Sequence, residues 1–265
     1  MIESRGGIMP PTYFESTDAG GKDTIADCVL AQSTNLTYEG PLKSGGLFLD
    51  TSLELFDEWQ VQYPGPNYFP GVLLAATTRD LMMAALAPAS QLPFLQASHN
   101  SIRGAAYQNA YGLPLSDLFD ETTAMIPPDY GIVALDTSIG ELQRRVLNNP
   151  KATAFDRLVL EDPERVQAIE DGIVERCIYA GGLVVSTTDK SPEEICEEVA
   201  VKRGMLWASK DSSRTRQILA QGTTLLTELG GRPGYRCLGA IVDQILEEVA
   251  VYSGVYIPTE NDCAD

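Results

Sequence analysis

The chain has 265 residues, of which 44% are hydrophobic, so it can bury a substantial core as one α/β domain with an added segment. Its formal net charge of -18 disfavours a duplex-DNA binder and a binder of anionic membranes, because both need a concentrated basic face. The cysteines form no C-x-x-C pair, no apolar run reaches the length of a membrane span, and the N-terminus lacks a signal-peptide layout, so we expect a cytoplasmic protein.

Residues 1–11 are rich in glycine and proline and are predicted to be a flexible lead-in. The segment from Tyr13 to Thr24 then predicts a short strand that turns at Gly20-Gly21 into a helix with Lys22 at its start. Backbone N–H groups of a glycine turn and of a helix N-terminus converge on anions, and a lysine adds a mobile positive charge. The segment therefore has the outline of a phosphate-binding loop.

This loop departs twice from the pattern G-x-x-x-x-G-K-[ST]. Ser16 stands at the first glycine, and Asp23 stands where a hydroxyl would bind magnesium. An ordinary Gly-Gly turn before a helix, with Asp23 favouring the helix dipole, is the alternative interpretation.

Apolar spacing predicts most of the remaining elements in chain order. It predicts helices over residues 25–31, 47–59, 72–86, 163–179, 192–204, 215–229 and 238–252, and strands over residues 92–97, 131–135 and 182–187. Ser138-Ile139-Gly140-Glu141 matches a capping box that opens a helix with Arg144 and Arg145. Residues 148–155 are predicted to be a flexible lid. Residues 210–265 are predicted to be a helical hairpin that packs on the core or on a partner subunit, with a homodimer expected.

Five short motifs follow one another in the order found in thymidylate kinases. They are Phe14-Glu15-x-x-Asp18-x-Gly20-Gly21-Lys22-x-Thr24, Leu73-Leu74-Ala75-Ala76-Thr77-Thr78-Arg79, Ala105-Ala106-Tyr107-Gln108, Pro128-Asp129-Tyr130-Gly131-Ile132-Val133-Ala134-Leu135-Asp136 and Asp156-Arg157. From about residue 12 to residue 205 the chain resembles this family of P-loop nucleoside monophosphate kinases. The resemblance implies a three-layer α/β kinase domain over residues 12–209, with a parallel sheet flanked by helices, and residues 210–265 as an extension.

The resemblance also implies a reaction, in which the γ-phosphoryl group of ATP passes to dTMP or a related deoxypyrimidine monophosphate with Mg²⁺. Catalysis is then expected from Lys22, Asp18, Arg103 and Arg145. The expected ATP-binding residues are Ala19, Gly20, Gly21, Lys22, Asp23, Thr24, Arg144 and Arg157, with Asp23 as the magnesium ligand. The two arginines that follow the capping box are alternatively a solvated helix face.

The expected acceptor-binding residues are Asp18, Glu39, Arg79, His99, Arg103, Tyr107 and Gln108. In the family, the aspartate holds the sugar and the glutamine reads the pyrimidine edge. Two places depart from the family pattern: Tyr38-Glu39-Gly40-Pro41 lacks an arginine, and Ser98-His99-Asn100 replaces an Asp-Arg pair, for which Arg103 is the candidate substitute. The plainer alternatives are a surface role for Arg79, core packing for Tyr107 and an ordinary polar loop residue for His99.

Two further hypotheses remain open at this point. The altered positions could mark another acceptor, such as a modified deoxyuridylate or another monophosphate. Alternatively, the chain could be a catalytically weak nucleotide-binding subunit that assembles through its C-terminal hairpin. Turnover of ATP with a panel of monophosphates separates these readings.

Overall fold

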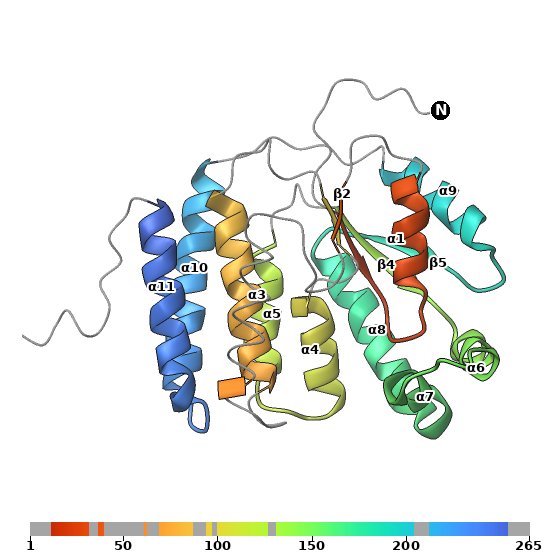
Figure 1. Ribbon diagram of the computed structural model, residues 1–265, viewed down its shortest axis with the longest axis horizontal. Coiled ribbons are helices and arrows are strands. Elements are labelled where there is room, and N and C mark those ends of the chain that lie inside the picture. The colour runs from red at the N-terminus through yellow and green to blue at the C-terminus, as the bar shows by residue number, and fades with distance from the viewer. Residues whose placement is uncertain are drawn as a thin grey trace, which may run out of the picture.

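A parallel sheet forms the centre of the described structure. The computed structural model describes residues 12–31, 37–39, 61–62, 69–86, 94–96, 100–126, 131–203 and 212–253. The strands are β1 (Thr12–Glu15), β2 (Thr37–Glu39), β3 (Phe94–Gln96), β4 (Gly131–Asp136) and β5 (Leu183–Ser186), in the spatial order β2-β3-β1-β4-β5. All neighbouring pairs are parallel, so the predicted α/β fold with a parallel sheet is confirmed, and β1 is its central strand (Figure 1).

Side chains of β1 and β4 alternate between two hydrophobic clusters, one on each face of the sheet. Phe14 and Val133 pack with α1 (Lys22–Ala31) and α9 (Pro192–Arg203). Tyr13 and Ile132 belong to the larger cluster on the opposite face. A strand buried on both faces is expected to be a nearly continuous apolar run, which is why Gly131 to Leu135 could be recognised in the sequence.

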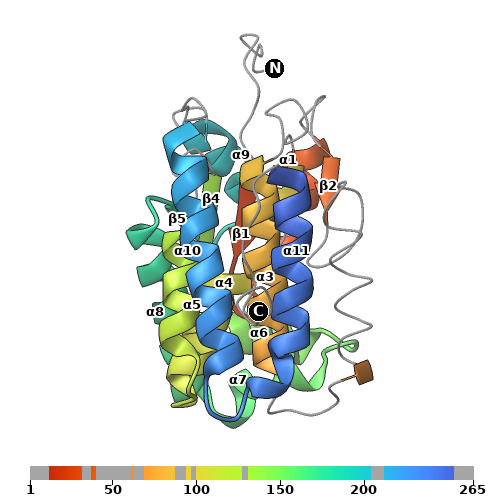
Figure 2. The ribbon, with the colours of Figure 1, turned by 90° about the vertical axis from the view of Figure 1, so that its left-hand side faces the viewer.

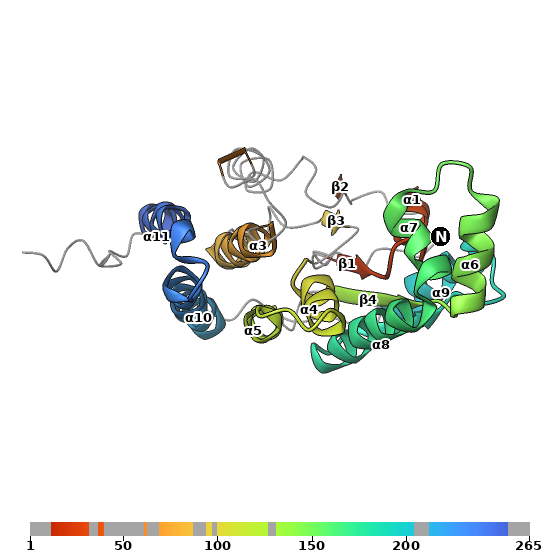
Figure 3. The same cartoon turned by 90° about the horizontal axis from the view of Figure 1, so that it is seen from below.

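The larger cluster is covered by successive pairs of helices. The helices of this half are α3 (Phe69–Leu86), α4 (Asn100–Ala110), α5 (Ser116–Ala124) and α8 (Pro163–Tyr179). Beyond them lie α10 (Ser212–Gly231), the short 3₁₀ helix η2 (Arg236–Leu238) and α11 (Gly239–Ser253). Seen from below, α4 and α8 lie nearest the sheet, α3 and α5 lie beyond α4, and α10 and α11 are outermost (Figure 3).

The C-terminal hairpin packs on its own chain. The two predicted helices are present as α10 and α11, and they lie over α3 and α5 (Figure 2). Leu226 and Ile245 are fully buried in the same cluster as Leu74. Gly222 allows a close approach, since a Cβ there would lie 2.4 Å from the sulfur of Met82. The apolar stripes that suggested a partner subunit are therefore covered within the chain.

Local capping signals account for several helix boundaries. Ser138 caps α6 (Ile139–Asn148) by accepting a hydrogen bond from the Glu141 N–H, as the sequence predicted. Asp162 caps α8, whose first residue is Pro163. The helix predicted over residues 47–59 lies outside the described residues. Within the described ranges, no helix combines the length and apolar character needed to cross a bilayer.

The segment predicted to be a lid consists of a turn and the start of a helix. Residues 149–153 connect α6 to α7 (Ala154–Glu161), and Thr153 forms a reciprocal capping box with Asp156. The Ala152 N–H also donates to the Asn149 carbonyl at 3.1 Å. Asp156 therefore caps α7, a structural role that its place in the Asp-Arg motif did not predict.

Candidate functional site

The predicted phosphate loop lies at the carboxyl end of the central strand. Residues 16–21 join β1 to α1, which packs on one face of the sheet. The chain leaves the neighbouring strand β4 through α6 and α7 towards α8, whose residues Ile169 and Ile173 pack on the opposite face. In open α/β sheets, ligands bind where adjacent strands have connections on opposite faces. The loop occupies such a point, between the ends of β1 and β4.

The loop has a backbone conformation suited to its glycines. Gly21 has a φ of 89°, in the left-handed region that favours glycine. A Cβ on Gly20 would lie 2.5 Å from the Cβ of Ser16, so only glycine fits this turn without a shift. The Gly20 N–H donates to the Thr17 carbonyl at 3.1 Å. Ala19 also has a positive φ, 64°, which costs about 1–2 kcal/mol for a residue with a Cβ.

The first turn of α1 presents both charge and backbone donors. Lys22 is the first residue of the helix and is 8% exposed, whereas Asp23 and Thr24 are exposed. The first N–H groups of a helix lack partners within the helix, and the helix dipole favours an anion there. This end of α1 can therefore bind an anionic group of a ligand.

Asp18 joins the loop to α4 through a charged cluster. It accepts a hydrogen bond from Tyr107 Oη at 2.7 Å and forms an ion pair with Arg103. The Arg103 guanidinium also lies over the Tyr107 ring, 5.3 Å from its centroid. Burial alone would raise the pKa of Asp18, but Arg103, Tyr107 and Lys22 outweigh it and hold the pKa below its usual value. Asp18 therefore stays ionised beside two cations.

Arg145 of α6 reaches the loop from the other side. Its Nη1 donates to the Gly20 carbonyl at 2.9 Å, and its Nη2 donates to Thr187 Oγ1 at 3.2 Å. Its Nε donates to Glu141 at 2.8 Å. Hydrogen bonds from Arg144 and then Arg145 lower the pKa of Glu141 to about 2. Arg144 itself is exposed and paired with Glu141, as a solvated helix face would be.

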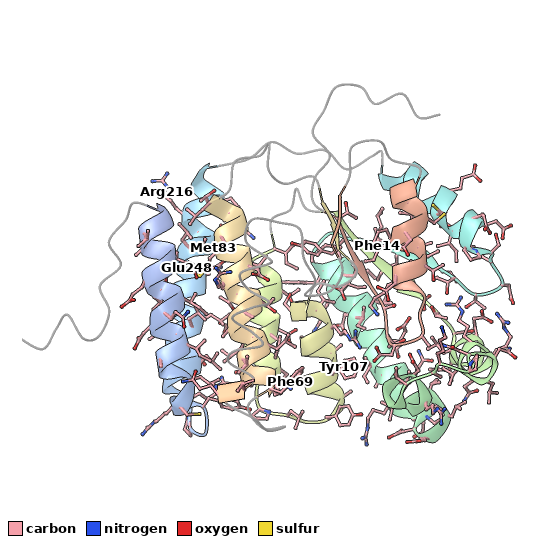
Figure 4. The ribbon with its side chains drawn as sticks, viewed as in Figure 1. Phe14, Phe69, Met83, Tyr107, Arg216 and Glu248 are labelled. Atoms are coloured by element: carbon pink, nitrogen blue, oxygen red, sulfur yellow. The ribbon has the colours of Figure 1, made fainter. Side chains whose placement is uncertain are left out.

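The structure does not bring Arg79 to this cluster. Arg79 lies on α3, is 1% exposed and donates from Nε to Glu248 of α11 at 2.7 Å. Figure 4 shows Glu248 near the Met83 end of α3, whereas Tyr107 lies level with the opposite end, at Phe69. The predicted acceptor-binding role is corrected: Arg79 joins α3 to the hairpin.

Gln108 also has a structural partner. Its side chain is 5% exposed, and its Oε1 accepts a hydrogen bond from the Leu115 N–H at 3.3 Å, which holds the connection between α4 and α5. This contact engages the side-chain oxygen that the predicted base-reading role would use. Arg157 is exposed on α7. Glu39 is placed only as part of β2, through its backbone pairing with Gln96, and His99 lies outside the described residues.

A buried glutamate that the sequence analysis did not single out lies beneath the loop. Glu170 of α8 is 1% exposed, and it accepts hydrogen bonds from the N–H groups of Thr17 and Thr137. A signal was present in the sequence, because Glu170 lies within the apolar face of α8 defined by Val166, Ile169 and Ile173. A carboxylate in such a stripe needs partners from other elements.

The site thus combines a glycine loop at a helix N-terminus with lysine and arginine side chains and a buried carboxylate below. A comparison with models of known protein families finds no match, and a comparison with curated protein sequences finds none either.

Proposed function

We propose that the chain is an ATP-dependent kinase of a nucleoside monophosphate, acting on dTMP or a related deoxypyrimidine monophosphate. The observation that carries the proposal is the contact between Arg145 and the Gly20 carbonyl, at the loop that follows the central strand. It places a guanidinium, a lysine and a helix N-terminus around one short loop. Phosphoryl transfer depends mainly on positioning and on neutralising charge, for which these groups are suited.

In this proposal, the first turn of α1 and Lys22 bind the ATP phosphates. Gly20 and Gly21 let the backbone approach them closely, and the exposed Thr24 is available to a phosphate oxygen. Arg145 stabilises negative charge as the γ-phosphoryl group moves, from a guanidinium that keeps its hydrogen bond to the Gly20 carbonyl. Arg144 and Arg157 are exposed and are assigned a weaker, screened contribution.

The acceptor is assigned to the side of the loop that faces α4. Asp18 is suited to accept a hydrogen bond from a sugar hydroxyl. Arg103 belongs to the same cluster as Asp18, and its guanidinium is suited to bind the acceptor phosphate. Tyr107 orients Asp18 through its hydroxyl, and its ring is held by stacking with Tyr111 at a centroid distance of 6.5 Å. Gln108 and Arg79 are left out because both side chains have structural partners.

The donor set at the loop fits the expected magnesium ion. Asp23 offers an exposed carboxylate beside Lys22, and Mg²⁺ is commonly held by one or two carboxylates together with substrate phosphates and water. When bound, the ion neutralises phosphate charge. Asp23 would hold it in place of the hydroxyl that the loop pattern normally provides. Among the described residues, no group of three or more His, Cys, Asp or Glu side chains is arranged to hold a metal ion by itself.

The test is a kinase assay with ATP, Mg²⁺ and a panel of nucleoside monophosphates. Lys22→Ala is expected to lower kcat/KM by a factor of about 10² to 10³, as for loss of a preorganised donor to the transition state. Arg236→Ala, which removes an exposed positive charge from the hairpin, is the matched control and should change nothing. Wild-type turnover by the Lys22 variant would contradict the proposal.

The same assay separates the alternatives. Turnover with a monophosphate other than a deoxypyrimidine would support the kinase assignment and change the identity of the acceptor. ATP binding without turnover of any monophosphate would favour a binding subunit. Against that second reading, the hairpin that would mediate assembly has its apolar stripes covered by α3 and α5.

A further inference from the structure

We infer that Glu170 is a positioning residue that holds the phosphate loop in its ligand-binding conformation; this inference rests on the proposed function. Glu170 reaches the loop from α8, on the far side of the sheet from α1. Its Oε2 accepts the Thr17 N–H at 3.1 Å, and its Oε1 accepts the Thr137 N–H at 2.9 Å. One carboxylate thus joins the start of the loop to the residue that follows β4.

The position of these two donors explains why a carboxylate is needed. Strands β1 and β4 pair up to Glu15 and Ala134, and the chain then turns away from β4 into the loop. Backbone N–H groups buried beyond the end of the ladder need acceptors. A carboxylate has two acceptor oxygens and can serve both groups, whereas an amide has one oxygen and would direct a donor at the second N–H.

A second chain of contacts holds the other end of the loop. Thr137 Oγ1 and Thr187 Oγ1 share a hydrogen bond of 2.7 Å, and Thr187 Oγ1 also accepts one from Arg145 Nη2 at 3.2 Å. Arg145 Nη1 then donates to the Gly20 carbonyl at 2.9 Å. Together with Glu170, these contacts form a closed ring around the loop. The ring is attached to the loop at both Thr17 and Gly20.

Burial keeps the Glu170 side chain away from water and in contact with this ring. The residue is 1% exposed, and Thr17, Thr137 and Thr187 are equally buried. Desolvation raises the pKa of Glu170 despite the two backbone N–H groups, so the fold keeps a carboxyl group at a place that penalises its charge. An apolar side chain here would pack on Ile169 and Ile173 without this penalty. The two N–H groups at the loop are the observed compensation.

The inference separates the two halves of the site. Glu170 acts on Thr17 of the loop, whereas Asp18, the next residue, is held by its own contacts with Arg103 and Tyr107. Loss of one hydrogen bond that orients the loop is expected to weaken phosphate binding by a factor of about 10. The acceptor KM should stay within a factor of about 2.

The experiment measures binding of ATP and of inorganic tripolyphosphate to the full chain by calorimetry. Glu170→Gln is compared with Asp120→Asn, which breaks the ion pair between Asp120 of α5 and Arg176 of α8, the helix of Glu170, without touching the loop. We expect the Kd of both probes to rise about tenfold in the Glu170 variant and to stay unchanged in the control. The steady-state assay should show the same rise in the ATP KM alone.

If Glu170 had only a structural role, Glu170→Gln would raise the KM of ATP and the KM of the acceptor together, in proportion to its loss of Tm. Wild-type affinity for ATP and tripolyphosphate in Glu170→Gln overturns the inference and leaves the proposed function standing. If neither probe binds the wild-type chain, the proposed function and the inference fall together. If Glu170→Gln does not fold, Glu170→Asp keeps the charge and shortens the reach, and unchanged affinity in that variant overturns the inference.

Discussion

Replacing Glu248 with alanine tests whether Arg79 joins α3 to the hairpin. The guanidinium of Arg79 is 1% exposed, and the substitution removes the carboxylate that accepts from its Nε and Nη2. Breaking a buried ion pair by removing one partner costs about 3–5 kcal/mol. Here Glu248 is 23% exposed and Asp80 stays 3.7 Å from Arg79 Nη1, so water and the second carboxylate reduce the cost. We expect a loss of about 2–3 kcal/mol.

Thermal and urea unfolding measure this loss directly. Unfolding entropies of about 2 cal/mol/K per residue give roughly 0.6 kcal/mol/K for a chain of this length, so Tm should fall by about 4 to 5 °C. Glu247→Ala, at an exposed position on the same helix, is the matched control and should cost less than about 0.5 kcal/mol. Replacing Arg79 and Glu248 together with methionine should recover most of the loss.

Two results would refute the reasoning. One is a loss in Glu248→Ala no larger than in the Glu247 control. The other is a tenfold rise in the acceptor KM with an unchanged ATP KM, since Arg79 would then act on the acceptor after all. The assay should therefore be run well below the unfolding transition of the variant.

Three further predictions follow from other contacts. Gly20→Ala should lower both ATP affinity and Tm, measured by calorimetry and unfolding, because Gly20 and Ser16 are buried and a new Cβ would lie 2.5 Å from the Ser16 Cβ; wild-type affinity would contradict the loop geometry. Asp18→Asn should cost about 1–2 kcal/mol of unfolding free energy at pH 7, measured in urea. The pKa of Asp18 is lowered in the folded state, so its stabilisation is present above the ordinary pKa and is lost as the pH falls through the folded pKa. The stability difference from the wild type should therefore shrink below about pH 4, and a constant difference would count against the Arg103 pair. Truncation after Ser209 should give aggregated protein by light scattering, since it exposes the face of α3 that the hairpin covers, and a soluble folded fragment would show that this contact is dispensable.

Local signals in the sequence predicted much of the fold. The cap at Ser138, the proline at the start of α8 and the apolar run of β4 each depend on neighbours within a few residues, and each element formed where it was expected. The left-handed conformation of Gly21 and the helix that begins at Lys22 are also features that local sequence determines. Short-range sterics and hydrogen bonding determine these features, so one sequence is enough to find them.

Partners distant along the chain could not be predicted in the same way. Arg79 and Glu248 are 169 residues apart, and the spacing on α3 does not reveal which element will cover the arginine. The apolar stripes of α10 and α11 indicated burial without indicating whether their own chain or a second one would cover them. The contact of Gln108 was missed for a different reason: its partner, Leu115, is close in sequence, but the direction in which the side chain points cannot be read from the sequence.

The single hydrophobic cluster that joins α3 to α10 and α11 has a consequence for biosynthesis. A chain that emerges at about 5–20 residues per second needs about 2–8 s to add Ser212 to Ser253. During that interval the face of α3 that packs on α10 and α11, with Met82 beside Gly222, is uncovered. The nascent chain thus exposes an apolar helical surface until α10 and α11 have been made. We therefore expect its yield in cells to depend on chaperones that bind exposed apolar segments and on slow growth at low temperature.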